Sequence, residues 1–418
     1  MCKVVCGQST RGVDSMKGML RYAGVFVFRT AGCGWGAVLA CISLTSTSTG
    51  QPCQPILVSS IDIPGDALGV DISKGVAYIA SGLGGIRAID VSDPYSPTSL
   101  GGKFTYSFAF DITVCQSVAY LVMAETHDGG AVVCVHDVSN PRDIHSINSF
   151  ARYYPQDLTL QGRVAYVASF EDGLQIFDIQ DPSTPELLGV YAPSNSYVAV
   201  AASGHVVYAG QCDVNPFVVS IDVSSPATPY LLDSQPIFNF FISEIAVVKD
   251  LLYVASEGNL DQLDILDASN PADLLPLGTL GLPSSCSGIT VTGDRAYLAN
   301  RESGLIVLDI SQPTAPMIIG SYDTPDNAAH VAVSEGIAYV ADRETGLLIL
   351  DISSCGAIPL GDFDSDHAVN LEDAAQFIGF LKGPRILCWD ECCEADLDGD
   401  CDVDMLDTRI FMNNFTGS

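Results

Sequence analysis

Two short acidic stretches near the C-terminus carry the residues best suited to bind a metal ion. From Asp362 to Asp373, oxygen-bearing side chains stand at loop positions 1, 3, 5, 9 and 12, and a main-chain carbonyl is available at position 7. The stretch from Asp396 to Asp407 repeats this spacing, which is that of EF-hand-type calcium loops. The sequence therefore predicts two Ca²⁺ ions, with these ligands: Asp362, Asp364, Asp366, Ala368, Asn370 and Asp373 in one loop, and Asp396, Asp398, Asp400, Asp402, Asp404 and Asp407 in the other.

Apolar residues in helical spacing follow each loop, at 377–381 and again at 410–415. Two such loops, each with one following helix, resemble a type I dockerin. The resemblance implies that calcium folds the module and that the module docks onto a cohesin-like domain of a partner protein. His367 and Cys401 stand where the sharp turn of the loop favours glycine, and 371–372 and 405–406 depart from the usual cohesin-contacting pair.

Cysteines also gather in this acidic region. Cys388, Cys392, Cys393 and Cys401 could form one or two disulfides, and a zinc site is the alternative. The whole chain contains 14 cysteines, which favours disulfides if the protein is exported.

The overall charge limits the kind of partner. The formal net charge is −32, and nucleic acid or an anionic membrane surface requires clustered Lys and Arg. Nucleic acid is therefore not an expected partner, whereas cations are. Apolar residues make up 48% of the chain and charged residues 16%, which is enough to build a large core.

Residues 1–50 have the order of a secretory signal peptide. Lys17 and Arg21 come first, an apolar run over 31–44 follows, and small polar residues close the segment. We expect a secreted or cell-surface protein without a membrane span. A single membrane anchor is the alternative, although the uninterrupted run is shorter than the ~20 residues that cross a bilayer. Residues 38–41 also resemble a lipoprotein cleavage box, which would place a lipid anchor on Cys41.

Between these two ends the chain is repetitive. A tyrosine and an aspartate recur seven times each, in steps of about 41 to 47 residues, the period of four-stranded propeller blades. The tyrosines are Tyr78, Tyr120, Tyr166, Tyr208, Tyr253, Tyr297 and Tyr339, and the aspartates are Asp90, Asp137, Asp178, Asp222, Asp267, Asp309 and Asp351. The repeat predicts seven blades.

One unit shows how each blade is built. In the sixth, short β-branched runs at 288–292, 295–300, 305–310 and 317–322 are separated by Gly- and Pro-containing turns. The repeated aspartate precedes a turn, where its side chain can accept a hydrogen bond from the backbone two residues on. We interpret it as a turn residue and not as a catalytic acid.

Segments such as 305–311 and 347–353 resemble LVIVD repeats, found in secreted or surface-attached bacterial and archaeal proteins expected to form β-propellers. The resemblance covers about residues 55–355 and supplies no catalytic residues. The fourth unit departs from it, because Gln211 to Pro216 replaces the usual glycine turn.

The seventh unit lacks a fourth strand, and residues 55–61 match the fourth strand of the sixth unit. The N-terminal strand should therefore complete the last blade, which leaves no long free sheet edge. Alignment of the units places Cys53 next to Cys355, so we predict a disulfide between them, with two free thiols as the alternative.

The predicted fold is thus an all-β, seven-bladed propeller at 51–356, closed by its N-terminal strand and followed at 357–418 by a small α-helical, dockerin-like calcium domain. Two functions remain open: a non-enzymatic binding or scaffold protein, or an enzyme that degrades extracellular polysaccharide through paired carboxylates. The loops expected to face a ligand contain 152–154, Glu171 and Asp172, 239–241, 300–302 and 342–344, with His127 and His330 nearby.

Overall fold

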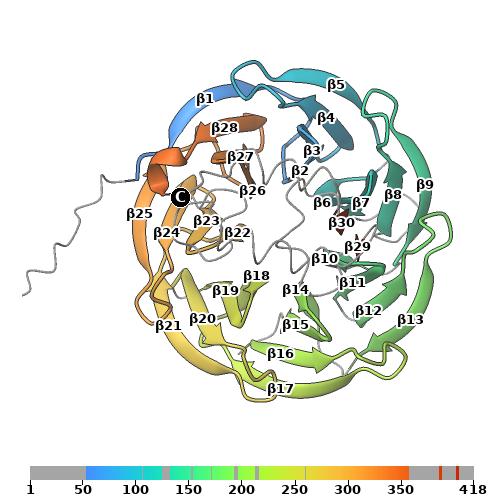
Figure 1. Cartoon of the computed structure of the whole chain (residues 1–418), viewed down its shortest axis with the longest axis vertical. Helices are drawn as coiled ribbons and strands as arrows, with labels where there is room; N and C mark the ends of the chain where they lie inside the picture. Colours follow the sequence, from blue (N-terminus) through green and yellow to red (C-terminus); the bar gives the residue numbers. More distant parts are fainter. Residues whose placement is uncertain are drawn as a thin grey trace, which may run out of the picture. The chain divides into compact units, whose positions relative to one another are not determined.

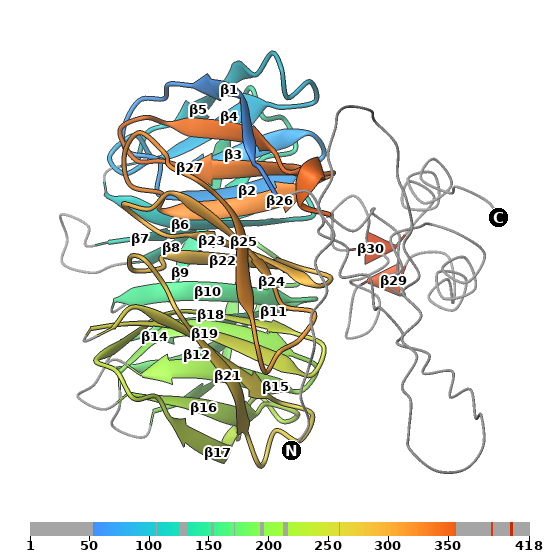
Figure 2. The same ribbon diagram turned by 90° about the vertical axis from the view of Figure 1, so that its left-hand side faces the viewer.

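The computed structural model describes residues 53–105, 107–124, 132–151, 154–170, 172–192, 196–211, 216–258 and 260–356, with the backbone of 386–387 and 402–403. Residues 53–356 form a ring of seven four-stranded antiparallel sheets (Figure 1). Seen from the side, the strands run through the thickness of the ring (Figure 2). The predicted seven-bladed propeller is confirmed.

The first three blades follow the chain in order. Blade 1 contains β2 (Gly69–Ser73), β3 (Val76–Ala80), β4 (Ile86–Asp90) and β5 (Thr98–Lys103). Blade 2 contains β6 (Ala109–Cys115), β7 (Val118–Met123), β8 (Val132–Asp137) and β9 (His145–Phe150). Blade 3 contains β10 (Pro155–Gln161), β11 (Val164–Ser169), β12 (Gly173–Asp178) and β13 (Glu186–Tyr191).

The next three blades repeat the arrangement. Blade 4 contains β14 (Tyr197–Ser203), β15 (Val206–Gln211), β16 (Phe217–Asp222) and β17 (Tyr230–Pro236). Blade 5 contains β18 (Phe241–Val248), β19 (Leu251–Glu257), β20 (Gln262–Asp267) and β21 (Leu275–Gly281). Blade 6 contains β22 (Gly288–Thr292), β23 (Arg295–Ala299), β24 (Leu305–Asp309) and β25 (Met317–Tyr322), within one residue of the strands expected from the sequence.

Blade 7 combines both ends of the repeat region. Its sheet has the order β1-β28-β27-β26, in which β26 (His330–Ser334), β27 (Ile337–Ala341) and β28 (Leu347–Asp351) are followed by the N-terminal strand β1 (Ile56–Ile61). β1 pairs antiparallel with β28, from Ile56 opposite Asp351 to Ile61 opposite Leu347. Closure by the N-terminal strand therefore occurs as the sequence predicts.

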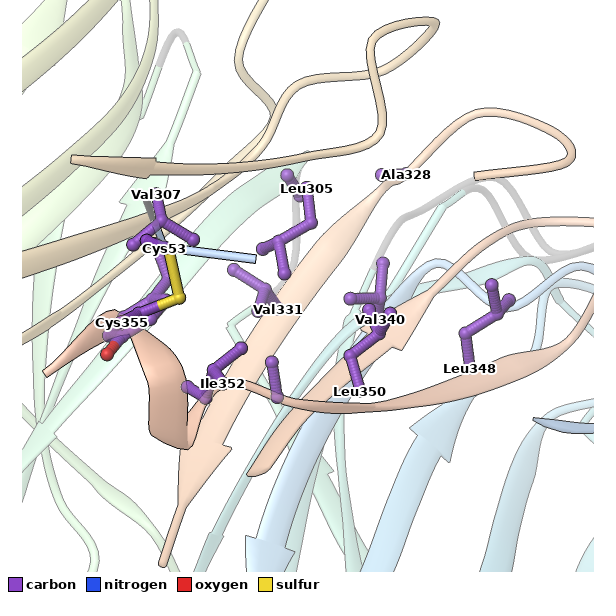
Figure 3. Close-up of a cluster of buried hydrophobic side chains, with 13 residues drawn as sticks. Cys53, Leu305, Val307, Ala328, Val331, Val340, Leu348, Leu350, Ile352 and Cys355 are labelled. Carbon is purple, nitrogen blue, oxygen red and sulfur yellow. A yellow bond between two sulfur atoms is a disulfide. The ribbon is translucent and has the colours of Figure 1, made fainter. Parts of the chain in front are cut away.

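A disulfide joins the two ends at this blade. Cys53 precedes β1, Cys355 ends the short 3-10 helix η1 (Ser353–Cys355), and their sulfur atoms are bonded (Figure 3). The pairing agrees with the one obtained from alignment of the units. Both cysteines are buried in the apolar cluster between blades 6 and 7.

Apolar contacts between neighbouring blades form the core. The inner and middle strands supply most of these residues: Val307 of blade 6, for example, lies in one cluster with Val331, Val340 and Leu350 of blade 7 (Figure 3). The fourth strands lie at the circumference and are largely exposed, as the pattern of β25 shows. Each blade is therefore buried chiefly by its two neighbours, as the short, small inner strands predict.

The repeated aspartates act as turn residues. In every unit the aspartate Oδ1 accepts a hydrogen bond from the backbone N–H two residues on, at 2.8 to 3.1 Å. In blade 1, for example, Asp90 Oδ1 also accepts from the Ser92 hydroxyl, and this bond lowers the pKa of Asp90. The interpretation of these acids as structural is confirmed.

The expected calcium ligands lie outside the described residues, apart from the backbone of Asp402. Asp402 belongs to β30 (Asp402–Val403), which pairs antiparallel with β29 (Ile386–Leu387). The N-terminal segment with Cys41, and the cysteines at 388–401, also lie outside the described residues. No helix among the described residues is long and apolar enough to cross a membrane.

Candidate binding sites on the propeller

One end of the ring, here called the upper face, carries the loops between the second and third strands and the loops between blades. At four blade junctions a backbone bridge links these two kinds of loop: Gly82 with Ala109, Phe170 with Tyr197, Arg301 with Ala328, and Arg343 with Ala67. These bridges continue the ring of hydrogen bonds from one blade to the next. The upper face is therefore a joined surface and not a set of independent loops.

The polar residues that open these loops hold the loops in place. Asn300 is 0% exposed; its Oδ1 accepts from the N–H of Ser284 at 3.0 Å and its Nδ2 donates to the Ser284 carbonyl. Asp342, also buried, accepts from the N–H of Asp326 at 3.0 Å. Both were expected to face a ligand, but their bonds run to the backbone of the loop that enters the same blade.

The two arginines in these loops also have structural roles. Arg301 and Arg343 adopt left-handed φ angles of 37° and 42°, the conformation that glycine takes at the corresponding position 82. Their backbones form two of the bridges between blades. The side chain of Arg301 pairs with Glu257 at 3.2 Å, and both groups remain partly exposed. A pair of this kind contributes little stability.

Four of the other face residues expected from the sequence lie outside the described residues: His127, Arg152, Tyr153 and Glu171. Asp172 is described, and its N–H donates to the carbonyl of Ser169 within the turn of blade 3.

The aromatic residues at the junction of blades 4 and 5 do reach the surface. Phe238 is 89% exposed, and Phe240 and Phe241 are exposed beside it. The buried Asn239 holds their loop, because its Nδ2 donates to the Leu260 carbonyl at 2.6 Å and to the Ser256 hydroxyl at 3.1 Å. The hydrogen bonds of Asn239 thus fix the conformation of a loop whose large apolar side chains are exposed to solvent.

Further exposed apolar side chains stand on the same face. We call the whole set the upper-face apolar residues: Leu83, Phe104, Phe108, Tyr154, Phe238, Phe240, Phe241 and Leu260. In blade 1 the guanidinium carbon of Arg87 lies 4.1 Å from the centre of the Phe104 ring, a cation–π contact that orients the ring. Exposed apolar groups fixed on a rigid scaffold are typical of interaction surfaces.

A second candidate site lies on the inner strands, which line the centre of the ring. Asp71, Asp111, Asp157 and Glu244 stand there on β2, β6, β10 and β18. Asp71 Oδ2 accepts from the N–H of Val114 at 2.6 Å, in the next blade. Asp157 Oδ2 accepts in the same way from the N–H of Val200 at 2.7 Å. Two of these acids therefore join neighbouring inner strands.

Their enclosure changes the acidity of these groups. Burial, followed by the charge of Asp111, raises the pKa of Asp157 to about 7, and burial raises the pKa of Asp71 to about 6. Burial and then the charges of Asp157 and Asp111 raise the pKa of Glu244 well above its usual range. Carboxyls of this kind hold their protons to a higher pH than exposed carboxyls do.

His330, on β26, belongs to the same group. Burial lowers its pKa, and the charge of Asp111 partly opposes that effect. Its Nδ1 has no hydrogen-bond partner among the described residues. The sequence analysis placed His330 near the loops expected to face a ligand and assigned it no partner residue. It did not identify the acidic residues of the inner strands. Among the described residues, no three His, Cys, Asp or Glu side chains are arranged to hold a metal ion.

The fold defines the protein as a seven-bladed β-propeller. The LVIVD repeat model matches residues 64–105, 154–192, 242–278, 284–324 and 325–357. These segments correspond to blades 1, 3, 5, 6 and 7. The chain is therefore a propeller that contains LVIVD repeats, and its second and fourth blades fall outside the matched segments.

Solved structures share the fold at low sequence identity. A computationally designed protein, Ika8, has a TM-score of 0.53 at 10% identity, covering 72% of this chain and 100% of its own. A chain of the mitotic checkpoint complex gives 0.55 at 14%, covering 75% and 98%. Saccharomyces cerevisiae Sqt1 gives 0.53 at 8%, covering 71% and 98%. No curated protein matches the chain.

Proposed function

We propose that the protein is a secreted, non-enzymatic propeller that binds a partner through its upper face. The observation that supports this most directly is the exposure of the upper-face apolar residues on loops held by buried hydrogen bonds. Phe238 is the clearest case, since it is 89% exposed while Asn239 next to it is buried and fully engaged. Burying such a ring against a partner is worth about 1.5 to 3 kcal/mol.

The proposal includes a second attachment through the C-terminal region. Residues 357–418 would form the dockerin-like module, bind two Ca²⁺ ions at the ligands given above and attach the propeller to a cohesin-like domain. The ligand spacing, repeated twice, supports this part.

Calorimetric titration of the full chain with CaCl₂ tests the calcium part. We expect two ions to bind, and the double variant Asp362→Ala, Asp396→Ala to lose that binding. Asp264→Ala, a propeller residue that bonds to Thr279, should leave it unchanged. Absence of calcium uptake by the unaltered chain would refute the calcium module and leave the upper-face proposal standing.

A screen of glycan and protein arrays, with calcium present, tests the upper face. Phe238→Ser should abolish the signal of the partner found, because it removes the most exposed ring without disturbing packing. Leu187→Ser, an exposed residue of the outer strand β13, is the matched control and should retain it. Equal loss in both variants would count against a face-specific site.

An extracellular polysaccharide-degrading enzyme is the second candidate, favoured by the interacting carboxyls of Asp111, Asp157 and Glu244. Glycoside cleavage uses one protonated and one ionised carboxyl. Release of reducing sugar from a polysaccharide panel, lost in Glu244→Gln, would favour it over the binding protein.

A further inference from the structure

Blade 4 departs from the other blades at two positions that face each other across β14 and β15. Tyr197 pairs directly with Gln211. At three other junctions the residue that occupies the place of Tyr197 in the bridge is an alanine, Ala67, Ala109 or Ala328. A large polar ring has thus replaced a methyl group, in one of the two blades that lie outside the LVIVD matches.

Gln211 stands where four other blades have a shorter polar residue that bonds to the loop entering the same blade: Ser81 donates to the Pro64 carbonyl, Ser256 accepts from Asn239, and Asn300 and Asp342 bond to Ser284 and Asp326. Blade 2 has Met123 there, and in blade 3 the hydroxyl of Ser169 has no partner among the described residues. Among the described residues Gln211 makes no bond of this kind. Its side chain lies close to the Tyr197 hydroxyl, where it favours the ionised phenol and partly offsets the burial that raises the pKa of Tyr197.

A pocket of about 200 Å³ adjoins this pair, between blades 3 and 4. Its walls include the rings of Tyr191 and Phe217 and the side chain of Leu231, and Ser234 adds a hydroxyl. The rings of Tyr191 and Tyr197 lie 6.4 Å apart, centre to centre, and are tilted by 34°. A cavity of about 150 Å³ is large enough to hold benzene, so this pocket has room for one substituted six-membered ring.

The polar groups at the pocket are available to a ligand. Tyr197 is 0% exposed, yet its hydroxyl has no hydrogen-bond partner of normal geometry among the described residues. An enclosed hydroxyl without a partner costs about 1 to 3 kcal/mol. Gln211, 4% exposed, supplies both an amide donor and an acceptor beside it.

We propose that this pocket binds an uncharged aromatic ring bearing a hydroxyl, such as a small phenol or a tyrosine side chain. The seven described residues that line it include none with a charge, which disfavours ionic ligands. Apolar and aromatic walls suit a flat ring, and the adjoining polar groups of Tyr197 and Gln211 suit one hydroxyl. A sugar ring would bring more hydroxyls than these two groups can satisfy.

Titration of the full chain with p-cresol, followed by saturation-transfer NMR, tests the site, and toluene serves as the ring without a hydroxyl. We expect p-cresol to bind about threefold to tenfold more tightly than toluene, the contribution of one net hydrogen bond. In Tyr197→Phe that preference should fall to about onefold to twofold while toluene binding persists, which also shows that the pocket is intact. Tyr208→Phe, in the same blade but outside the pocket, should keep the preference.

A blocking variant provides the decisive comparison. Leu231→Trp should remove p-cresol and toluene binding together, whereas Leu187→Trp, at the corresponding exposed position of blade 3, should retain both. No p-cresol binding to the unaltered chain, or unchanged binding in Leu231→Trp, would overturn the proposal. The peptide Gly-Tyr-Gly identifies the source: tighter binding than p-cresol indicates a partner's side chain, and weaker binding indicates a free phenol.

Discussion

Blade 7 and blade 4 differ from the regular blade in opposite ways. Blade 7 is assembled from two distant parts of the chain, yet its sheet, its buried Asp342 and its left-handed Arg343 follow the common pattern. Blade 4 is continuous in sequence, yet it exchanges the small residues of its upper end for Tyr197 and Gln211. Chain continuity therefore does not decide the geometry of a blade, whereas two side chains are enough to change its chemistry.

Removing the disulfide tests how far blade 7 depends on covalent closure. We expect Cys53→Ser with Cys355→Ser to lower the free energy of unfolding by about 2 to 5 kcal/mol, because the bond closes a loop of 302 residues in the unfolded chain. Urea denaturation followed by circular dichroism measures the change. Cys134→Ser, at a free cysteine of β8, is the control, and equal midpoints for the two variants would show that β1 pairing alone closes the ring.

Truncation of the equivalent loop residues compares a regular blade with blade 4. Asn300→Ala leaves the N–H and carbonyl of Ser284 unpaired, so we expect a loss of about 1 to 3 kcal/mol in the free energy of unfolding. Gln211→Ala enlarges a pocket and breaks no bond to a described backbone group, so we expect less than about 1 kcal/mol. Thermal or urea unfolding of both variants measures these losses. A larger loss of unfolding free energy in Gln211→Ala than in Asn300→Ala would contradict the proposed difference between blade 4 and the regular blades.

The pH dependence of stability tests the role of Asp157, which joins the inner strands of blades 3 and 4. The pKa of Asp157 is raised from 3.8 to about 7 in the folded protein, so between those values the folded state holds a proton that the unfolded chain has released. The free energy of unfolding therefore falls as the pH rises through this window, by at most about 1.4 kcal/mol per pH unit. Asp157→Asn cannot titrate and should gain stability relative to the unaltered protein as the pH rises from about pH 5 to about pH 7.

Asp267→Asn provides the control for that measurement. Hydrogen bonds from Ser269 lower the pKa of Asp267, so its contribution is present above its unfolded value and is lost only in acid. The difference between this variant and the unaltered protein should stay constant over the same range. A parallel shift in both variants would mean that the inner-strand carboxyls do not carry the effect.

Much of the fold could be predicted because the repeated residues are those that the strands and turns of each blade require. The spacing of Tyr297 and Asp309, repeated in the other units, indicates the strand lengths and the turn type. The last unit lacks a fourth strand, and this absence indicated that the N-terminal strand closes the ring. The inner-strand acids were missed because only some units carry them. Asp71, Asp111, Asp157 and Glu244 each stand immediately before an isoleucine or leucine in a short apolar strand, and that shared placement could have identified them.

The binding surface was less predictable from sequence for a different reason. Asn300 and Asp342 have the side chains expected of a ligand site, but which group they bond to depends on a loop folded beside them. Whether a hydroxyl is left without a partner, as in Tyr197, depends on the fit of two blades and is not encoded in any single segment.

The pairing of β1 with β28 also has a consequence for synthesis. The first strand leaves the ribosome almost a whole propeller ahead of the strand it must join, so its hydrogen-bonding edge stays open until the last blade is made. During that interval it is a template for pairing with another chain. Ile56 and Leu57 are exposed on β1 even in the finished ring, so pairing with β28 removes a hydrogen-bonding edge that also carries apolar side chains.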